Sequence, residues 1–378
     1  MHAIGESSVF PATEVQALID ALAARGYRVI GPVLHQGAIG LGEITDAAAL
    51  PRGLRQAKTG GREVIRDAGD GAYFAHTVGP EAPKRYLHPA ERRICRIERQ
   101  GDELSIVAEP DAPPRYAFLG VRGCDLAGMA VLDRVLRDDR FRDPAYAARR
   151  ADNLIIAVNC TEPGGTCFCA SMGTGPRAGP GYDLALTELL GGGRHDFLAE
   201  VGTEAGAALL EELTCREPAD ADRAAADAAL AEATANMGRR MPAADLKALL
   251  QDNREHPRWD DVAERCLTCA NCTMVCPTCF CTTVTDTSDL EGEIAARWQH
   301  WDSCFTLDFS IVHGGSLRAS ARSRYRQWMT HKLADWHDQF GTSGCVGCGR
   351  CIAWCPVGID ITEEAAAIHA ASQAGEGA

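Results

Sequence analysis

The sequence has no long apolar run and no excess of positive charge, and each absence excludes a class of protein. No stretch of the chain approaches about 18 consecutive apolar residues, so no transmembrane helix is expected. The N-terminal residues 1–16 contain neither the basic region nor the apolar run of a signal peptide. The formal net charge of −14 argues against binding to nucleic acid or to a membrane surface. We therefore expect a soluble, cytoplasmic protein.

Several catalytic motifs are missing as well. No G-x-G-x-x-G sequence follows an expected strand, so a dinucleotide site on this chain is not predicted. Neither an H-E-x-x-H motif nor a Ser-His-Asp arrangement is evident. We accordingly assign no catalytic residues to the chain.

Cysteine, in contrast, is abundant. The 378 residues include 17 cysteines, an odd number that fits poorly with complete disulfide pairing. Many of them gather in short C-x-x-C runs, which a secreted disulfide scaffold would not require. In a reducing compartment, clustered cysteines are better explained as metal ligands.

Two runs, at residues 266–277 and 345–356, match the pattern C-x₂-C-x₂-C-x₃-C-P of two-cluster ferredoxins. Three cysteines of each run wrap one [4Fe–4S] cluster, and the fourth ligates the other cluster. By this rule, one cluster has the ligands Cys266, Cys269, Cys272 and Cys355. The second has the ligands Cys345, Cys348, Cys351 and Cys276. Zinc is the alternative, but it would leave the third cysteine and the C-P of each run unexplained.

A third set of cysteines follows two expected strands. Residues 116–121 and 153–158 are apolar enough to be buried strands, and residues 125–136 between them have helical spacing. This order favours a parallel unit, with the following cysteines at the carboxyl edge where ligand sites collect. The candidate ligands of a third [4Fe–4S] cluster are Cys124, Cys160, Cys167 and Cys169. The alternative is a group of buried, unliganded thiols.

Three further cysteines, Cys279, Cys281 and Cys304, have no assigned role. They either complete or replace ligands of the third site, or are structural thiols near the ferredoxin-type clusters. The segment 277–344 that contains them is far longer than the loop of a minimal ferredoxin, and residues 319–336 in it have a helical pattern. Its cations include Arg318 and Lys332. They form a solvated basic face, or they lie near the anionic clusters or bind an acidic partner.

These patterns predict an α+β fold, in which an N-terminal α/β domain precedes an all-helical two-cluster ferredoxin-like domain. The α/β domain, with the candidate third site, should cover residues 1–204, and an Ala-rich helical bridge should cover 205–258. The ferredoxin-type domain with its long helical insertion should cover 259–366, and a flexible tail 367–378.

The motifs together resemble a known family. In order they are RGCDLAGM, NCTEPGGTCFCASMGTGP, CPTCFC, WDSC and CVGCGRCIAWCPVGIDI. They resemble those of the beta subunit of cytosolic sulfhydrogenase-type [NiFe] hydrogenases and of its relative, the electron-relay subunit of anaerobic sulfite reductase. The resemblance extends over residues 116–362 and leaves roughly the first hundred residues unmatched.

The resemblance implies an electron-relay subunit that is itself non-catalytic. Its expected partners are a flavoprotein subunit that carries FAD, NAD(P) and a [2Fe–2S] cluster, and the small and large [NiFe] hydrogenase subunits. In the sulfite reductase alternative, the acceptor is a sirohaem subunit. A lone redox sensor is a third hypothesis, which two clusters joined by exchanged ligands disfavour. The sequence leaves open whether the nucleotide is NAD or NADP, and in which direction electrons flow.

Overall fold

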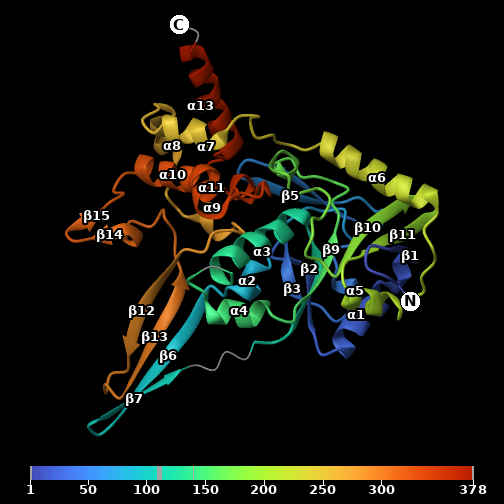
Figure 1. Cartoon of the computed structure of the whole chain (residues 1–378), viewed down its shortest axis with the longest axis horizontal. Coiled ribbons are helices and arrows are strands. Elements are labelled where there is room, and N and C mark those ends of the chain that lie inside the picture. Colours follow the sequence, from blue (N-terminus) through green and yellow to red (C-terminus); the bar gives the residue numbers. More distant parts are fainter. Residues whose placement is uncertain (1, 109–112, 139, 377–378) are drawn as a thin grey trace.

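The computed structural model describes residues 2–108, 113–138 and 140–376. A seven-stranded mixed sheet organises its N-terminal half (Figure 1). In spatial order the strands are β1 (Ser7–Pro11), β11 (Arg194–Val201), β10 (Leu184–Gly191), β9 (Leu154–Val158), β8 (Tyr116–Val121), β2 (Arg28–His35) and β3 (Ala38–Glu43).

The centre of this sheet is parallel, as predicted. β8 pairs in parallel with β2 and β9, and β9 pairs in parallel with β10. The helix α3 (Gly123–Leu136) connects β8 to β9, followed by α4 (Pro144–Arg150). β9 is buried at every position, as expected for a strand covered on both faces. The carboxyl ends of β8 and β9 therefore lie at the same edge of the sheet.

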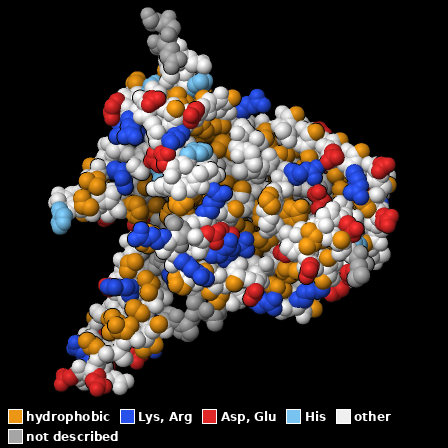
Figure 2. Space-filling view, in the orientation of Figure 1, with side chains coloured by type: hydrophobic (Ala, Val, Ile, Leu, Met, Phe, Trp, Pro, Cys, Tyr) orange, Lys and Arg blue, Asp and Glu red, His pale blue; other side chains and the backbone are white. Residues whose placement is uncertain are grey.

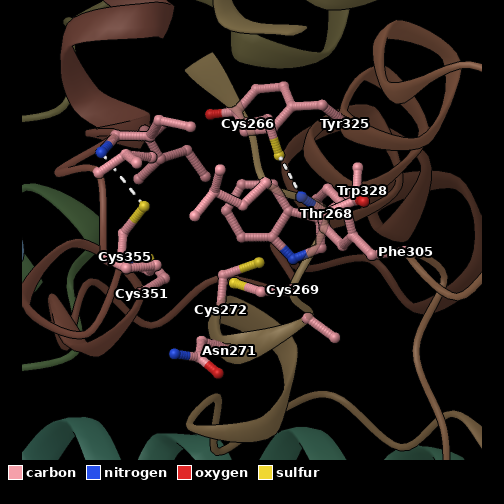
Figure 3. Close-up of a pocket in the computed structure, with 16 residues that line it drawn as sticks. Cys266, Thr268, Cys269, Asn271, Cys272, Phe305, Tyr325, Trp328, Cys351 and Cys355 are labelled. Atoms are coloured by element: carbon pink, nitrogen blue, oxygen red, sulfur yellow. Dashed lines mark hydrogen bonds between the residues drawn. The ribbon is translucent and has the colours of Figure 1, made fainter. Parts of the chain in front are cut away.

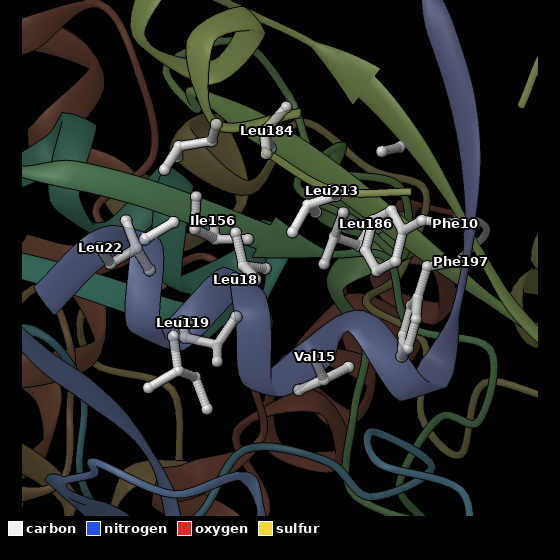
Figure 4. Close-up of a cluster of buried hydrophobic side chains, with 14 of the residues drawn as sticks. Phe10, Val15, Leu18, Leu22, Leu119, Ile156, Leu184, Leu186, Phe197 and Leu213 are labelled. Atoms are coloured by element: carbon white, nitrogen blue, oxygen red, sulfur yellow. The ribbon is translucent and has the colours of Figure 1, made fainter. Parts of the chain in front are cut away.

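Helices cover both faces of the sheet. On one face, α1 (Val15–Ala24) and α5 (Glu204–Leu210) pack on alternate strand residues such as Leu119 and Ile156 (Figure 4). On the other face, α3 packs on Phe118 and Ile155. Burial of each large apolar side chain contributes about 1.5–3 kcal/mol. This core holds the strand ends that carry the third set of cysteines.

The Ala-rich segment is helical, as predicted. It contains α6 (Asp220–Ala235), which packs on β10 and β11, and α7 (Leu246–Asp252). The helix α8 (Arg258–Arg265) then leads directly into Cys266. Its role as a bridge between two domains stays a prediction, as do the domain boundaries.

The C-terminal part contains the predicted long helix in three pieces. They are α10 (Ala321–Thr330), the π-helical turn η5 (His331–Asp335) and α11 (Trp336–Phe340). Three further helices complete this part: α9 (Asn271–Met274), α12 (Arg350–Ala353) and α13 (Ile361–Glu376). Their shared core is rich in aromatic residues and includes Trp259, Phe305 and Tyr325.

The prediction of an all-helical C-terminal domain is wrong. The segment between the motifs forms the strands β12 (Thr282–Ser288) and β13 (Ile294–Trp301), and the short hairpin β14 (Ile311–Val312) and β15 (Gly315–Ser316). β13 pairs with β6 (Glu91–Gln100), which pairs with β7 (Glu103–Ala108). The partner strand lies about 200 residues away in sequence, so local patterns did not indicate it.

This four-stranded sheet projects from the body as an arm (Figure 1). Apolar side chains gather on its surface (Figure 2), and those of Leu104, Ile106 and Val284 are more than half exposed. Among the described residues, no helix combines the length and the apolar character needed to cross a bilayer.

The N-terminal half also contacts the second cysteine motif directly, through the hairpin of β4 (Leu54–Thr59) and β5 (Arg62–Asp67). At its tip, the Gly61 amide donates to the Ile352 carbonyl at 3.1 Å. Gly61 has φ +70°, and a Cβ there would approach the Cys355 carbonyl oxygen to 2.7 Å, so glycine is required. The remaining short elements are α2 (Lys84–Leu87) and the 3₁₀ turns η1 (Ala12–Glu14), η2 (Ala47–Ala49), η3 (Cys169–Met172) and η4 (Asp308–Ser310).

Candidate iron–sulfur centres

The two cysteine motifs adopt the same backbone conformation. In the first, Thr268 and Ala270 have φ values of +50° and +67°. In the second, Gly347 and Gly349 occupy the equivalent positions with φ +63° and +71°. A left-handed conformation is unfavourable for Thr and Ala, so the loop is held there by its surroundings.

The first predicted ligand set lines one apolar pocket. Cys266 and Cys269 come from the loop after α8, Cys272 from α9, and Cys355 from the end of the second motif (Figure 3). Burial, reinforced by neighbouring thiols including Cys355, raises the pKa of Cys272 well above its usual value. Cys269 is exposed, so this pocket lies near the molecular surface.

Two features of this pocket fit an iron–sulfur cluster. Tyr325 Oη and Trp328 Nε1 in its wall are buried and have no hydrogen-bond partner within the described part of the chain. Cluster sulfur atoms accept hydrogen bonds, and would satisfy both donors. In addition, the amides of Thr268 and Ile359 donate to Cys266 Sγ at 3.4 Å and to Cys355 Sγ at 3.3 Å.

The second predicted set is also brought together. Burial raises the pKa of Cys345 to about 12, with contributions from the nearby thiols of Cys348 and Cys276. Burial and the thiols of Cys345, Cys348 and Cys276 likewise raise the pKa of Cys351. Cys276 of the first motif thus lies with the second set, and Cys355 of the second motif lies with the first. Cys351 of the second motif lines the same pocket as Cys355, and the exchange of fourth ligands stays a prediction.

The third set lies at the carboxyl edge of the parallel sheet. Cys124 is in the first turn of α3 after β8, and Cys160 follows β9. Burial raises the pKa of Cys169, and the thiols of Cys160 and Cys167 raise it further. Burial also raises the pKa of Cys124, to which the Cys169 thiol contributes. The Cys169 thiol thus interacts with each of the other three.

The third set contacts the second motif through the backbone. The Phe168 amide donates to the Gly347 carbonyl at 2.9 Å, and Cys167 Sγ lies 3.8 Å from the Cys348 carbonyl oxygen. A Cβ on Gly349 would come within 2.1 Å of the Thr166 carbonyl oxygen, so the two loops meet only because this residue is glycine. The third set therefore adjoins the second motif.

The unassigned cysteines lie beside the ferredoxin-type motifs. The Cys279 thiol and the Lys332 ammonium hold the pKa of Cys276 well below its usual value. Burial raises the pKa of Cys304 to about 12, and the Cys281 thiol contributes. Cys304 in turn raises the pKa of Cys272. This placement favours the second alternative for these cysteines, thiols near the ferredoxin-type clusters.

Within the described ranges, no group of three or more His, Cys, Asp or Glu side chains is close enough to hold a single metal ion. The thiolates of a [4Fe–4S] cluster bind different iron atoms and stand farther apart than the ligands of one ion.

Sequence patterns missed a buried ion pair that joins the two halves of the chain. Arg350, inside the second motif, is 2% exposed. Its Nη1 lies 2.8 Å from Asp125 Oδ1, and its Nη2 donates to Asp125 Oδ2 at 3.1 Å. Arg350 also donates to the carbonyls of Gly79 and Glu81. Both charged residues adjoin cysteines in the sequence, but spacing alone does not reveal that they meet.

The cations of the basic segment between the motifs make two kinds of contact. Arg322 pairs with Glu255 and Asp260, and Arg326 pairs with Glu255, so these cations are balanced at the surface. Lys332 instead faces the cysteines. The two interpretations of this segment therefore apply to different residues.

Comparison with known proteins agrees with this geometry. Residues 265–359 match the family model described as 4Fe-4S dicluster domain, which implies two [4Fe–4S] clusters and defines the chain as a dicluster iron–sulfur protein. The chain is also 32% identical over 300 residues to sulfhydrogenase 2 subunit beta of Pyrococcus furiosus, covering 76% of this chain and 82% of the relative. It therefore belongs to the sulfhydrogenase beta subunit family. No solved structure matches it.

Proposed function

We propose that this chain is the electron-transfer subunit of a cytoplasmic [NiFe] hydrogenase of the sulfhydrogenase type. It relays electrons between a flavoprotein subunit that binds FAD and NAD(P)H and the hydrogenase small subunit. The observation that carries the proposal is the pocket that Cys355 of the second motif lines together with Cys266, Cys269 and Cys272 of the first. Two clusters held by ligands from both motifs lie close enough for electron transfer. Electron transfer is the chemistry that the clusters supply when bound.

The ligands follow from the same grouping. One [4Fe–4S] cluster is held by Cys266, Cys269, Cys272 and Cys355, and the next by Cys345, Cys348, Cys351 and Cys276. A third is held by Cys124, Cys160, Cys167 and Cys169.

The contact between the second motif and the third set supports a relay. The first set reaches the surface at Cys269, and Leu267 of the same loop is 60% exposed. The third set adjoins the second motif at the carboxyl edge of the parallel sheet. Exposed apolar side chains on the arm support membership of a complex, because such patches are typical of contact surfaces.

The partners are proposed from the relative, a sulfhydrogenase subunit by name. The electron-relay subunit of anaerobic sulfite reductase, which would pass electrons to a sirohaem subunit, is the second candidate. Mass spectrometry of the native complex distinguishes them. We expect a flavoprotein and the small and large hydrogenase subunits to co-purify with this chain. A sirohaem protein in their place would favour the alternative, and a chain isolated without partners would contradict both.

Iron content tests the third site. Anaerobically purified protein should contain about twelve irons per chain, and Cys167→Ser about eight, because three clusters hold four irons each. Cys215→Ser is the matched control and should retain the wild-type iron, since Cys215 packs against the N-terminal core. About eight irons in the wild-type protein would show that the third set holds no cluster.

A further inference from the structure

Lysine is rare in this chain, and three of its four lysines are buried. The sequence has 34 arginines but only four lysines. Lys58, Lys84 and Lys332 are 5%, 4% and 6% exposed, whereas Lys247 pairs with Asp338 at the surface. Lysine is seldom buried, because removing an ammonium group from water costs several kcal/mol unless an anion compensates it.

Lys332 extends to the cysteines of the second set. Its Nζ lies 3.3 Å from Cys276 Sγ and 3.5 Å from Cys279 Sγ. It also donates to Thr278 Oγ1 at 3.0 Å and to the Gly344 carbonyl at 3.4 Å. In the described structure, none of these partners is a carboxylate. None of these partners therefore supplies a carboxylate charge that would balance the Lys332 ammonium.

The other two buried lysines lie near cysteines as well. Lys84 Nζ donates to the Cys279 carbonyl at 3.1 Å. The Lys58 ammonium acts on Cys167 of the third set, where it lowers the thiol pKa against the effect of burial. Lys58 has a carboxylate neighbour, Glu63, but their charged atoms are 3.9 Å apart. All three buried ammonium groups thus lie near cysteines.

The location of Lys332 in the helix adds an independent observation. It lies in η5, a π-helical turn inserted between α10 and α11. Such turns are rare and frequently occur at functional sites. Lysine also differs from the abundant arginine in concentrating its charge in one compact group. A compact charge beside Cys276 acts most strongly on whatever that thiolate binds.

We propose that the three buried lysines are counter-charges of the iron–sulfur clusters, and that Lys332 raises the reduction potential of the cluster held by Cys276. This inference rests on the proposed function, which supplies the clusters. The four thiolates carry more negative charge than the iron–sulfide core carries positive charge, so the cluster is a net anion. One-electron reduction adds a further negative charge, and a nearby ammonium therefore stabilises the reduced form more than the oxidised form.

The test is an EPR-monitored redox titration of the whole complex containing Lys332→Met. We expect full iron content and a midpoint potential for one cluster that is more negative by at least 59 mV, a tenfold change in the equilibrium for one electron. Lys332→Arg, which retains the charge, should shift less than Lys332→Met. Lys247→Met removes an exposed lysine and should leave every midpoint unchanged.

Unchanged midpoints in iron-replete Lys332→Met would overturn the inference. If that variant loses its cluster, Lys58→Met is titrated in its place, with a negative shift expected and unchanged midpoints again overturning the inference. Failure of the proposed function would look different. It would appear in the wild-type complex, as missing cluster signals or missing NAD(P)-linked activity.

Discussion

Replacing Cys348 by serine is expected to remove one cluster and to stop NAD(P)-linked electron transfer. Cys348 belongs to the second set and is 9% exposed, and its thiol acts on those of Cys124 and Cys169 in the third set, so a cluster lost here interrupts the relay. We expect iron content to fall by about four per chain. NAD(P)-linked activity of the complex should fall by more than about 100-fold, the upper end of the loss seen when only a supporting residue of a metal site is removed.

The catalytic partner should remain active with artificial dyes in the same preparation, because dyes bypass this subunit. Cys95→Ser is the control, since Cys95 lies on β6 in the arm. Wild-type NAD(P)-linked activity in Cys348→Ser would contradict the relay assignment. Loss of dye-linked activity as well would indicate that the complex no longer assembles.

Replacing Arg350 by methionine is expected to destabilise the chain by about 3–5 kcal/mol, because it leaves the Asp125 carboxylate buried without its partner. The ion pair joins the second motif to the start of α3, so the loss should affect both halves. Denaturant unfolding of the anaerobic protein, followed by circular dichroism, measures the change in the free energy of unfolding.

Arg297→Ala provides the comparison for this prediction. Arg297 pairs with Asp286 on the arm, where both side chains are more than half exposed. An exposed pair contributes about 0–1 kcal/mol, so this variant should unfold almost as the wild type does. Similar losses for Arg350→Met and Arg297→Ala would mean that the buried pair does not join the two halves.

The parallel unit was predictable because its signals are local. The apolar runs that became β8 and β9, and the helical spacing that became α3, each lie within a few residues. The strands β12 and β13 were missed because β13 is stabilised by β6, which lies far away in the sequence. Strand formation depends on such partners more than helix formation does.

The grouping of the cysteines was likewise predictable in part from the sequence. Spacing within each motif indicated the two ferredoxin-type sets, and strand order indicated the third. The location of Cys279, Cys281 and Cys304 required the structure, because it depends on how the base of the arm meets the motif loops.

By itself, the sequence determined that this chain carries two ferredoxin-type motifs and a parallel α/β unit, because both depend on the spacing of residues that are close in the sequence. Only the tertiary structure decided what surrounds the cysteines. The buried lysines, the Arg350–Asp125 pair and the contact between the second and third sets join residues more than 50 positions apart. Burial and electrostatic interactions of this kind depend on distance in space, which a linear pattern does not contain.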